Sequence, residues 1–459
     1  MARTVRMVVP LASAVCLAMP SPCPGADPAF QQQFTRMCRT PGLNDPPEVC
    51  REKHQASQAA ARRIVAQGGR FVPEIMRELG PYPCMHFAQA LLAAIGTPSH
   101  DALREALPTA RGTILLNTIG MMGYEAKGLI PDLLRQLERP GRDTKYDVTI
   151  ITTLVQVGAD RRKMAERVNA IVTAPQPNTD FIRLAIALKH LGPDAAPVMP
   201  GVQRWLSKNR DHKYFDTTLR HLFGIGPMAA PLTRAIVDYY EAHPPPGGYS
   251  DNATRILGGI GPGAKASLPL LKAWLKDASG KSYDAPRALM IATAIACIEG
   301  QPSRAVSTLR KRVAAALASS SKTAGVALCA GVQTIGMMAH SHPQAARPLV
   351  PLVSRALRAR KRLGTATAAR VVRDMKPALA LGTVPDLIKS TSGVYEGAKP
   401  TYSSCYSRSV EALRSLAPYD KRVVAALDHL SKTDPHIAIR NMAREAVVYA
   451  NAVGPLKAR

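Results

Sequence analysis

The chain has 459 residues, with 60 Lys and Arg against 33 Asp and Glu, and a formal net charge of +27. Hydrophobic residues make up 46% of the chain and aromatic residues only 5%, so Ala and Leu supply most of a sizeable core. Both residues have a high helix propensity, so this composition favours a helical fold. No apolar run in the sequence reaches the 18 or more residues that suggest a membrane-spanning helix.

Residues 1–26 are typical of a bacterial export signal. Arg3 and Arg6 precede an apolar run from Met7 to Met19, and a stretch of breaker and small residues follows up to Ala26. The sequence therefore predicts a signal peptide at 1–26 and a periplasmic or secreted mature protein without a transmembrane segment. A leader that stays on a cytosolic protein is the alternative.

The mature chain keeps six cysteines, at 38, 50, 84, 297, 329 and 405. Segment 27–50 is predicted to be an N-terminal cap, in which Cys38 and Cys50 flank a Pro-rich loop and are the best candidates for a disulfide. Cys297 and Cys329 lie on predicted helices about one repeat apart. Either a bridge or two buried free thiols is compatible with their spacing.

A phrase of Gly, Pro and Ala recurs through the middle of the chain. It occurs as LGPDAA from Leu191, IGPMAA from Ile225 and IGPGAK from Ile260, and the glycines at 158, 192, 226 and 261 are spaced by 34, 34 and 35 residues. Gly ends a helix by adopting a left-handed conformation without strain, and Pro suits the start of the next helix. Apolar residues at helical spacing flank each phrase. The pattern predicts repeated units of helix, tight turn and helix.

This pattern resembles the HEAT-repeat family of armadillo-type α-solenoids, in its short variety with Gly-Pro-x-Ala at the turn. The resemblance implies an all-α fold of about ten to eleven stacked antiparallel helix pairs over residues 51–459, wound into a right-handed superhelix. It also implies that the second helix of each pair lines the concave surface. A Pro-rich turn at 243–250 and a Ser/Gly/Tyr loop at 390–404 interrupt the array. A tetratricopeptide array has a similar period, but its Trp, Gly-x-x-Tyr and Ala pattern is missing here.

Positive charge is concentrated in the second half of the chain, with a net +18 over residues 241–459 against +7 over 27–240. Residues 303–376 contain 14 Lys and Arg but one acid, Asp374. Helical spacing places some of these cations on one face of two successive second helices, which lie side by side in a stacked array. We name the predicted anion- or partner-binding set the basic band: Arg304, Lys311, Arg355, Arg358 and Arg362. A solvated surface that only keeps the protein soluble is the alternative.

Short matches to catalytic and cofactor motifs have simpler explanations. Gly224-x-Gly226-x-x-Ala229 resembles a dinucleotide fingerprint, but a predicted helix precedes it and Pro227 removes an N–H donor. His340-x-His342 is too small a set for zinc, which needs three or four converging ligands, so both histidines are predicted to be turn or surface residues. No catalytic, cofactor-binding or metal-binding residue is assigned.

The leading interpretation is an exported scaffold that binds a protein or an anionic polymer, envelope polymers and lipid head groups included, through the basic band and without catalysis or a cofactor. The alternative is a nucleic-acid binder of the DNA-repair glycosylase type, which the charge favours and an export signal opposes. An enzyme with a site in loop 390–404 is a third hypothesis, although Tyr395, Glu396, Tyr402 and the nearby Tyr406 specify no reaction.

Overall fold

The computed structural model describes residues 27–38, 47–79, 85–109, 113–139, 144–174, 181–208, 215–245, 250–279, 285–321, 323–359, 362–392, 404–434 and 437–455. Every regular element in these ranges is an α-helix or a 3-10 helix, and they contain no strand. The fold is all-α, as predicted. The signal peptide predicted at residues 1–26 lies outside the described residues.

The predicted helix breaks are glycines with positive φ. This angle is 94° at Gly158, 59° at Gly192, 63° at Gly226 and 71° at Gly261. At the last two, ψ is −139° and −136°, so these residues occupy an extended region rather than the left-handed helical region that was predicted. The phrase that follows also differs from a simple tight turn, because its residues form 3-10 helix before the second α-helix begins. Proline favours this arrangement by removing an N–H donor at the start of the new helix.

The described residues begin with three helices: α1 (Pro28–Cys38), α2 (Pro47–Ala66) and α3 (Val72–Arg77). The first helices of the following pairs, with the last helix of the chain, are α4 (Met85–Ile95), α6 (Thr113–Met122), α8 (Thr144–Gln156), α10 (Phe181–Leu191), α12 (Phe215–Leu222), α14 (Asp251–Ile260), α16 (Ala285–Ile298), α18 (Ala324–Ser341), α21 (Arg362–Asp374), α24 (Ser404–Leu416) and α26 (Ile437–Val453).

The second helices are α5 (His100–Ala106), α7 (Ile130–Leu137), α9 (Arg161–Thr173), α11 (Met199–Lys208), α13 (Thr233–Ala242), α15 (Leu268–Ser279), α17 (Ser303–Ala318), α20 (Val350–Arg358), α23 (Val384–Ser392) and α25 (Lys421–Thr433). Short α-helices α19 (Pro343–Ala346) and α22 (Pro377–Ala380) precede two of them. The 3-10 helices are η1 (Gly68–Phe71), η2 (Thr97–Ser99), η3 (Leu107–Thr109), η4 (Gly123–Leu129), η5 (Gly192–Val198), η6 (Phe223–Leu232), η7 (Gly261–Ser267), η9 (Arg347–Leu349), η10 (Leu381–Thr383) and η11 (Ala417–Tyr419).

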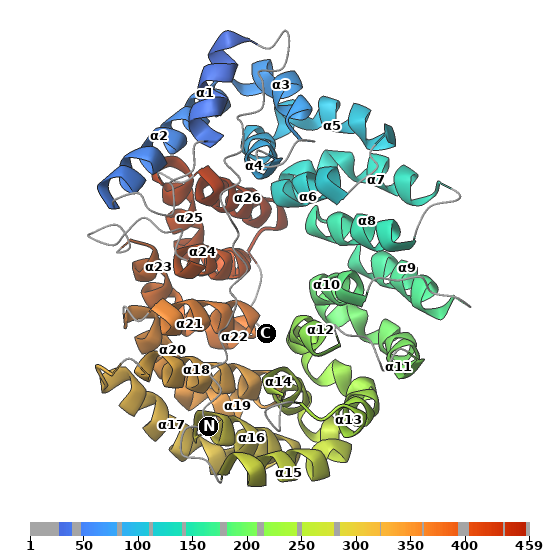
Figure 1. The fold of residues 1–459 in the computed structure, drawn as a ribbon, viewed down its shortest axis with the longest axis vertical. Coiled ribbons are helices and arrows are strands. Elements are labelled where there is room, and N and C mark those ends of the chain that lie inside the picture. The colour runs from blue at the N-terminus through green and yellow to red at the C-terminus, as the bar shows by residue number, and fades with distance from the viewer. Residues whose placement is uncertain are drawn as a thin grey trace, which may run out of the picture.

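The helices follow one another around a closed ring (Figure 1). Each first helix from α4 to α26 contacts the next first helix, and α26 in turn contacts α4, α6 and η4. The first helices lie toward the centre and the second helices lie outside them. The last helix of the array therefore packs against its first helices. The right-handed superhelix predicted from the sequence did not include this closure.

Small residues on the first helices allow this curvature. A Cβ on Gly258 of α14 would overlap Met337 of α18, and a Cβ on Gly336 would come within 3.0 Å of Val371 on α21. As a result α14 contacts α18 directly, although α16 lies between them in the chain order. Close approach of the first helices on the inner side bends the array inward.

The ends of the array meet through a polar contact, which we name the latch. Arg444 on α26 donates hydrogen bonds to both carboxylate oxygens of Glu125 on η4, at 2.9 and 3.0 Å, and to the carbonyl oxygen of Ala94 at 2.7 Å. Glu445 accepts a hydrogen bond from the backbone N–H of Tyr124 at 3.3 Å. At Gly123 there is no room for a Cβ, which would overlap the Glu445 carboxylate. The latch depends on a glycine as well as on ion pairs.

The apolar core forms two clusters. One extends from Phe30 to Ile298 and includes Met337, and the other extends from Ala296 to Ala450. They meet at α16 and α18, half-way round the ring from the latch.

The predicted segment boundaries are partly visible. The cap contains α1, whose Phe30, Phe34 and Met37 are buried, but its predicted end at residue 50 falls inside α2. The Pro-rich turn separates α13 from α14, and the Ser/Gly/Tyr loop lies between α23 and α24. Residues 246–249 and 393–403, and with them Tyr395, Glu396 and Tyr402, lie outside the described residues, as does the side chain of Tyr406.

Candidate functional site

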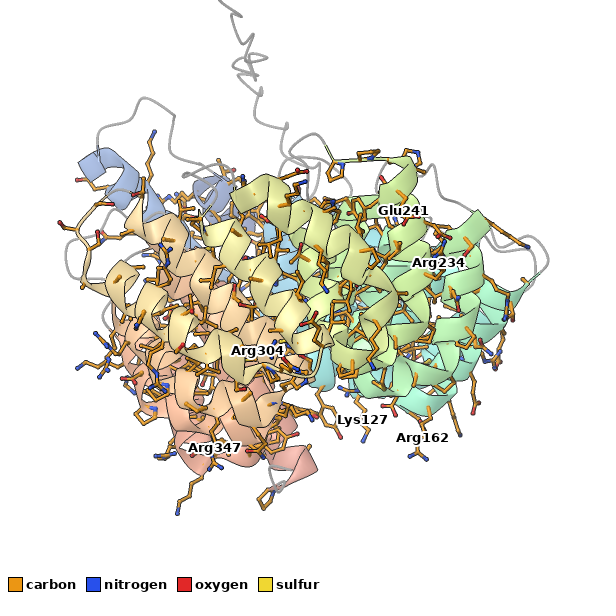
Figure 2. All side chains as sticks on the ribbon, turned by 90° about the horizontal axis from the view of Figure 1, so that it is seen from below. Lys127, Arg162, Arg234, Glu241, Arg304 and Arg347 are labelled. Carbon is orange, nitrogen blue, oxygen red and sulfur yellow. The ribbon has the colours of Figure 1, made fainter. Side chains whose placement is uncertain are left out.

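Four of the five residues of the basic band lie on two neighbouring second helices, whereas Arg362 begins α21, a first helix, and does not continue the second helix as predicted. Arg304 and Lys311 on α17 and Arg355 and Arg358 on α20 all have exposed side chains. The two helices contact each other, so these charges lie on adjoining parts of the surface. Figure 2 shows Arg304, together with Arg347 of η9, on the side of the molecule that carries these helices.

The band lies on the outer wall of the ring (Figure 1), so the expectation that second helices line the concave surface is wrong for this chain. The inner wall of the ring consists of first helices, and each of them packs against the next one. Arg358 forms an ion pair with Asp386 on α23, with 3.3 Å between Nε and Oδ1, which partly neutralises one end of the band. The side chain of Arg362, at the start of α21, lies outside the described residues.

A second group of cations belongs to first helices, which form the inner wall of the ring. We name it the central cluster: Lys189 on α10, Arg255 on α14, Arg370 and Arg373 on α21 and Arg408 on α24, with the carboxylates Asp374 and Glu411. Helix α10 is not a neighbour of α21 or α24 in the circle of first helices. Its Lys189 nevertheless feels the charges of Arg373 and Asp374. Side chains from opposite parts of the inner wall therefore converge.

Burial makes the central cluster electrostatically unusual. It lowers the pKa of Lys189, and the nearby charge of Arg373 lowers this pKa further. Burial likewise lowers the pKa of Arg255 and of Arg370, and each of these is lowered again by a neighbouring guanidinium. His190, next to Lys189, has its pKa lowered to about 4, mainly by burial.

The carboxylates of the cluster are already engaged by one arginine. Arg373 pairs with Asp374, with 2.8 Å between Nε and Oδ1, and its Nη1 donates a hydrogen bond to Glu411 at 2.8 Å. Arg408 lies 3.9 Å from the same Glu411 oxygen. The side chains of Asp374 and Arg373 are only 15% and 20% exposed. These two carboxylates therefore leave little negative charge for Lys189 and Arg370, while Arg255 also feels the charge of Asp251 on its own helix.

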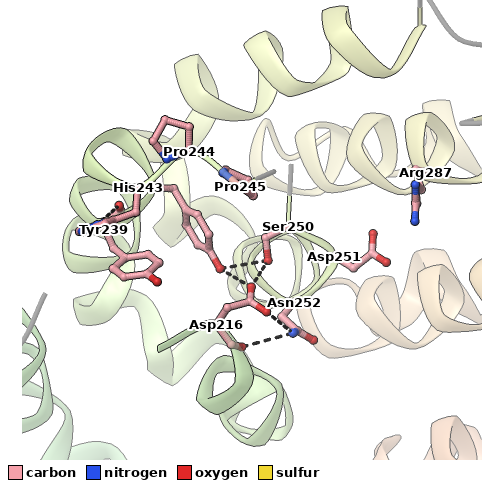
Figure 3. Close-up of a pocket in the computed structure, with 10 residues that line it drawn as sticks. Asp216, Tyr239, His243, Pro244, Pro245, Ser250, Asp251, Asn252 and Arg287 are labelled. Carbon is pink, nitrogen blue, oxygen red and sulfur yellow. Dashed lines mark hydrogen bonds between the residues drawn. The ribbon is translucent and has the colours of Figure 1, made fainter. Parts of the chain in front are cut away.

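A pocket of about 640 Å³ opens beside the ends of α13 and α14 (Figure 3). Asp216 at its base accepts hydrogen bonds from the hydroxyls of Tyr240 and Ser250 and, at 2.9 Å, from Nδ2 of Asn252. Tyr239 on its wall stacks on Phe215 with ring centroids 3.8 Å apart. These contacts join α12, α13 and α14. The carboxylate oxygens of Asp216 already accept hydrogen bonds within the protein, so we assign Asp216 a structural role.

The structure decides between the two possibilities for Cys297 and Cys329 but does not test the other cysteine pair. Cys297 and Cys329 are not joined: Cys297 is buried, which raises the pKa of its thiol to about 11, and Cys329 Sγ lies 3.0 Å from Thr367 Oγ1. The side chain of Cys50 lies outside the described residues, so the Cys38–Cys50 bridge stays a prediction.

The prediction that His340 is a turn or surface residue is wrong. It lies in the last turn of α18, where burial lowers its pKa and Nδ1 is 2.8 Å from the carbonyl oxygen of Gly336. Within the ranges that the structure describes, no three His, Cys, Asp or Glu side chains are grouped to hold a metal ion. None of the described helices is long and apolar enough to span a membrane.

The central cluster was missed by the sequence analysis, although a signal was present. Lys189 and His190 interrupt the apolar run IALKHLG, and Arg370 and Arg373 interrupt the run AARVVRDM. Polar residues at positions that a helix directs inward indicate either a satisfied network or a binding site. Which helices meet around them depends on closure of the ring.

Comparison with known proteins assigns no relative. No protein-family model matches this chain, and no curated protein sequence is similar to it. Among solved structures, a chain from "A conserved phosphorylation switch controls the interaction between cadherin and beta-catenin in vitro and in vivo" aligns over 92% of this chain and 99% of its own length, with 13% identity and a TM-score of 0.29. A TM-score of this size establishes neither a shared fold nor a shared function, so the functional conclusion depends on the molecule's own surfaces.

Proposed function

We propose that this protein is an exported, non-catalytic scaffold of the HEAT-like α-solenoid class that binds an anionic partner through the basic band. The recurring Gly-Pro breaks and the order of the helix pairs support the class. The N-terminal 26 residues support export to the periplasm or medium.

One observation carries the binding proposal. The described outer face of α17 and α20 presents exposed Arg and Lys side chains, and neither helix contains an acid. Exposed charges of one sign attract a polyanion over a Debye length of about 8–10 Å in ordinary salt. An acidic protein or an anionic envelope polymer fits this surface, and side chains on a rigid helical wall can bind it without rearrangement.

Charge reversal tests the binding surface. The variant Arg304→Glu, Lys311→Glu and Arg355→Glu is expected to elute from a sulfonate resin at clearly lower salt than the wild type, and to lose partners recovered with the wild type from cell envelopes. The matched control is Arg162→Glu, Lys163→Glu and Lys208→Glu, three exposed positions on α9 and α11. It changes the net charge equally, so equal losses in both variants would contradict a role for the band.

Cell fractionation tests the export half of the proposal. The mature chain is expected outside the cytoplasm, with an N-terminus near residue 27. Recovery from the cytoplasm with the leader intact and nucleic acid bound would contradict the proposal and favour the nucleic-acid binder, whose affinity falls steeply with salt.

A further inference from the structure

The central cluster has more positive charge than its own carboxylates neutralise. It contains five cations and two carboxylates, and Asp251 on α14 adds a third negative charge near Arg255. Both carboxylates bind Arg373, and Glu411 also lies near Arg408. The excess charge belongs to Lys189 on α10 and Arg370 on α21.

Two of these cations have unused binding capacity. The Nε of Arg370 is buried and has no hydrogen-bond partner among the described residues. No ion pair joins Lys189 to a carboxylate in the part of the chain that the structure describes. A buried cation without a partner costs free energy, because it loses water without gaining an acceptor.

The surroundings increase this cost. Arg370 lies near Arg408, Arg373 and Arg255, so like charges repel at short range where water is partly excluded. Removal of one cation would relieve the repulsion, and so would an anion bound among them. Guanidinium groups are well suited to bind such an anion, since they form paired, charge-assisted hydrogen bonds with phosphate-type oxygens.

We propose that the central cluster binds a compact, multiply charged oxyanion, such as a diphosphate group, between Lys189, Arg255 and Arg370. The ligand's oxygens accept hydrogen bonds from Arg370 and Lys189 and replace the missing carboxylates. Because α10 and α21 are not neighbours in the circle of first helices, the bound anion also joins two separate parts of the inner wall. This site is separate from the basic band, which lies on the outer wall.

Calorimetric titration of the full mature chain with inorganic diphosphate, at constant ionic strength, tests the proposal. Saturable binding is expected, and Arg370→Gln and Lys189→Met are each expected to weaken it about tenfold or more, the loss typical of a hydrogen bond to a charged group. The control Arg304→Gln removes an exposed cation of the basic band and is expected to leave the diphosphate affinity unchanged.

Thermal unfolding separates a lost site from a damaged fold. Diphosphate is expected to raise the Tm of the wild type, because a ligand that binds only the folded state stabilises it. Without ligand, Arg370→Gln and Lys189→Met are expected to unfold at or above the wild-type Tm, since each relieves repulsion. The same concentration of diphosphate should raise each of their Tm values less than it raises that of the wild type.

Three results would overturn the proposal: no saturable binding by the wild type, wild-type affinity in both central variants, or an equal loss in Arg304→Gln. A long inorganic polyphosphate distinguishes a compact ligand from a polymer. If it binds where diphosphate does not, and the charge reversals in the basic band abolish its binding, the anion site is the outer wall and the central proposal fails. Loss of partner binding in those reversals with diphosphate binding intact leaves both proposals standing.

Discussion

Gly226 shows how one residue sets a helix break. Its φ of 63° and ψ of −139° lie where a residue with a Cβ is strained, while the nearest atoms to such a Cβ, on His340, are 3.7 and 3.8 Å away. The cost of Gly226→Ala is therefore in the backbone, and we expect a loss of about 1–3 kcal/mol in the free energy of unfolding. Urea unfolding measures it.

Gly325 is the matched control for Gly226. It lies in the first turn of α18, and nothing is within 4 Å of where its Cβ would be. Gly325→Ala is expected to be neutral or to stabilise by up to about 1 kcal/mol, because alanine restricts the unfolded chain. Equal destabilisation by both substitutions would show that the break at 226 has no special backbone requirement.

His190 should make stability depend on pH. Burial and then the charges of Lys189, Arg414, Arg161 and Arg373 lower its folded-state pKa from 6.5 to about 4. The unfolded chain therefore takes up a proton before the folded one, so this contribution to stability is complete above pH 6.5 and is lost as the pH falls toward 4. Relative to His190→Gln, the wild type should lose about 2 kcal/mol between pH 7 and pH 5.

Urea midpoints for the wild type and His190→Gln at several pH values check this. Between pH 7 and pH 8 the two stabilities should run parallel, which provides the internal control. Parallel curves down to pH 5 would contradict the buried, neutral imidazole.

At the scale of single elements, the latch joins helices more than 300 residues apart in the chain. Arg444→Ala removes the guanidinium that bridges Glu125 and the carbonyl oxygen of Ala94. Because Glu125 is only 14% exposed, its carboxylate would lose a partner it needs, and we expect a loss of about 2 kcal/mol and faster hydrogen exchange in α26.

The ion pair between Arg422 and Asp420 is the control for the latch. Its Nη2–Oδ2 distance is 2.6 Å, but the arginine is 59% exposed and both residues belong to the start of α25. Arg422→Ala should cost less than about 1 kcal/mol and leave exchange in α26 unchanged. A similar cost in both variants would mean that the latch adds nothing beyond a surface ion pair.

The sequence predicts the elements better than their arrangement. Leu309 and Val313 of α17 and Val353 and Leu357 of α20 are buried and follow one another at helical spacing, which the sequence alone displays. The four predicted glycines, at 158, 192, 226 and 261, each lie at a helix break with positive φ, because Gly and Pro act on their immediate neighbours. The sequence does not reveal which helix faces inward, since that depends on small residues such as Gly258 packing against a helix two pairs away.

At the scale of the whole molecule, ring closure and the central cluster could not be predicted for the same reason. Small rotations accumulate over all the helix pairs before α26 reaches α4, and no local pattern encodes their sum. In the sequence, the cations of the central cluster cannot be distinguished from the many other Lys and Arg residues. They form a group only because the ring places α10 opposite α21. Four residues of the basic band lie on the neighbouring helices α17 and α20, but their position on the outer wall depends on the ring.

The closed ring is tested most directly by photo-oxidative cross-linking of tyrosines in the dilute monomer. The rings of Tyr124 on η4 and Tyr449 on α26 lie edge to face, with centroids 5.7 Å apart. Mass spectrometry of the digested monomer is predicted to show a peptide pair joined through these two tyrosines, which Tyr124→Phe abolishes. An open array would hold them far apart, at roughly 8–10 Å for each intervening helix. Absence of the Tyr124–Tyr449 link, while the adjacent Tyr239 and Tyr240 are modified, would contradict the ring.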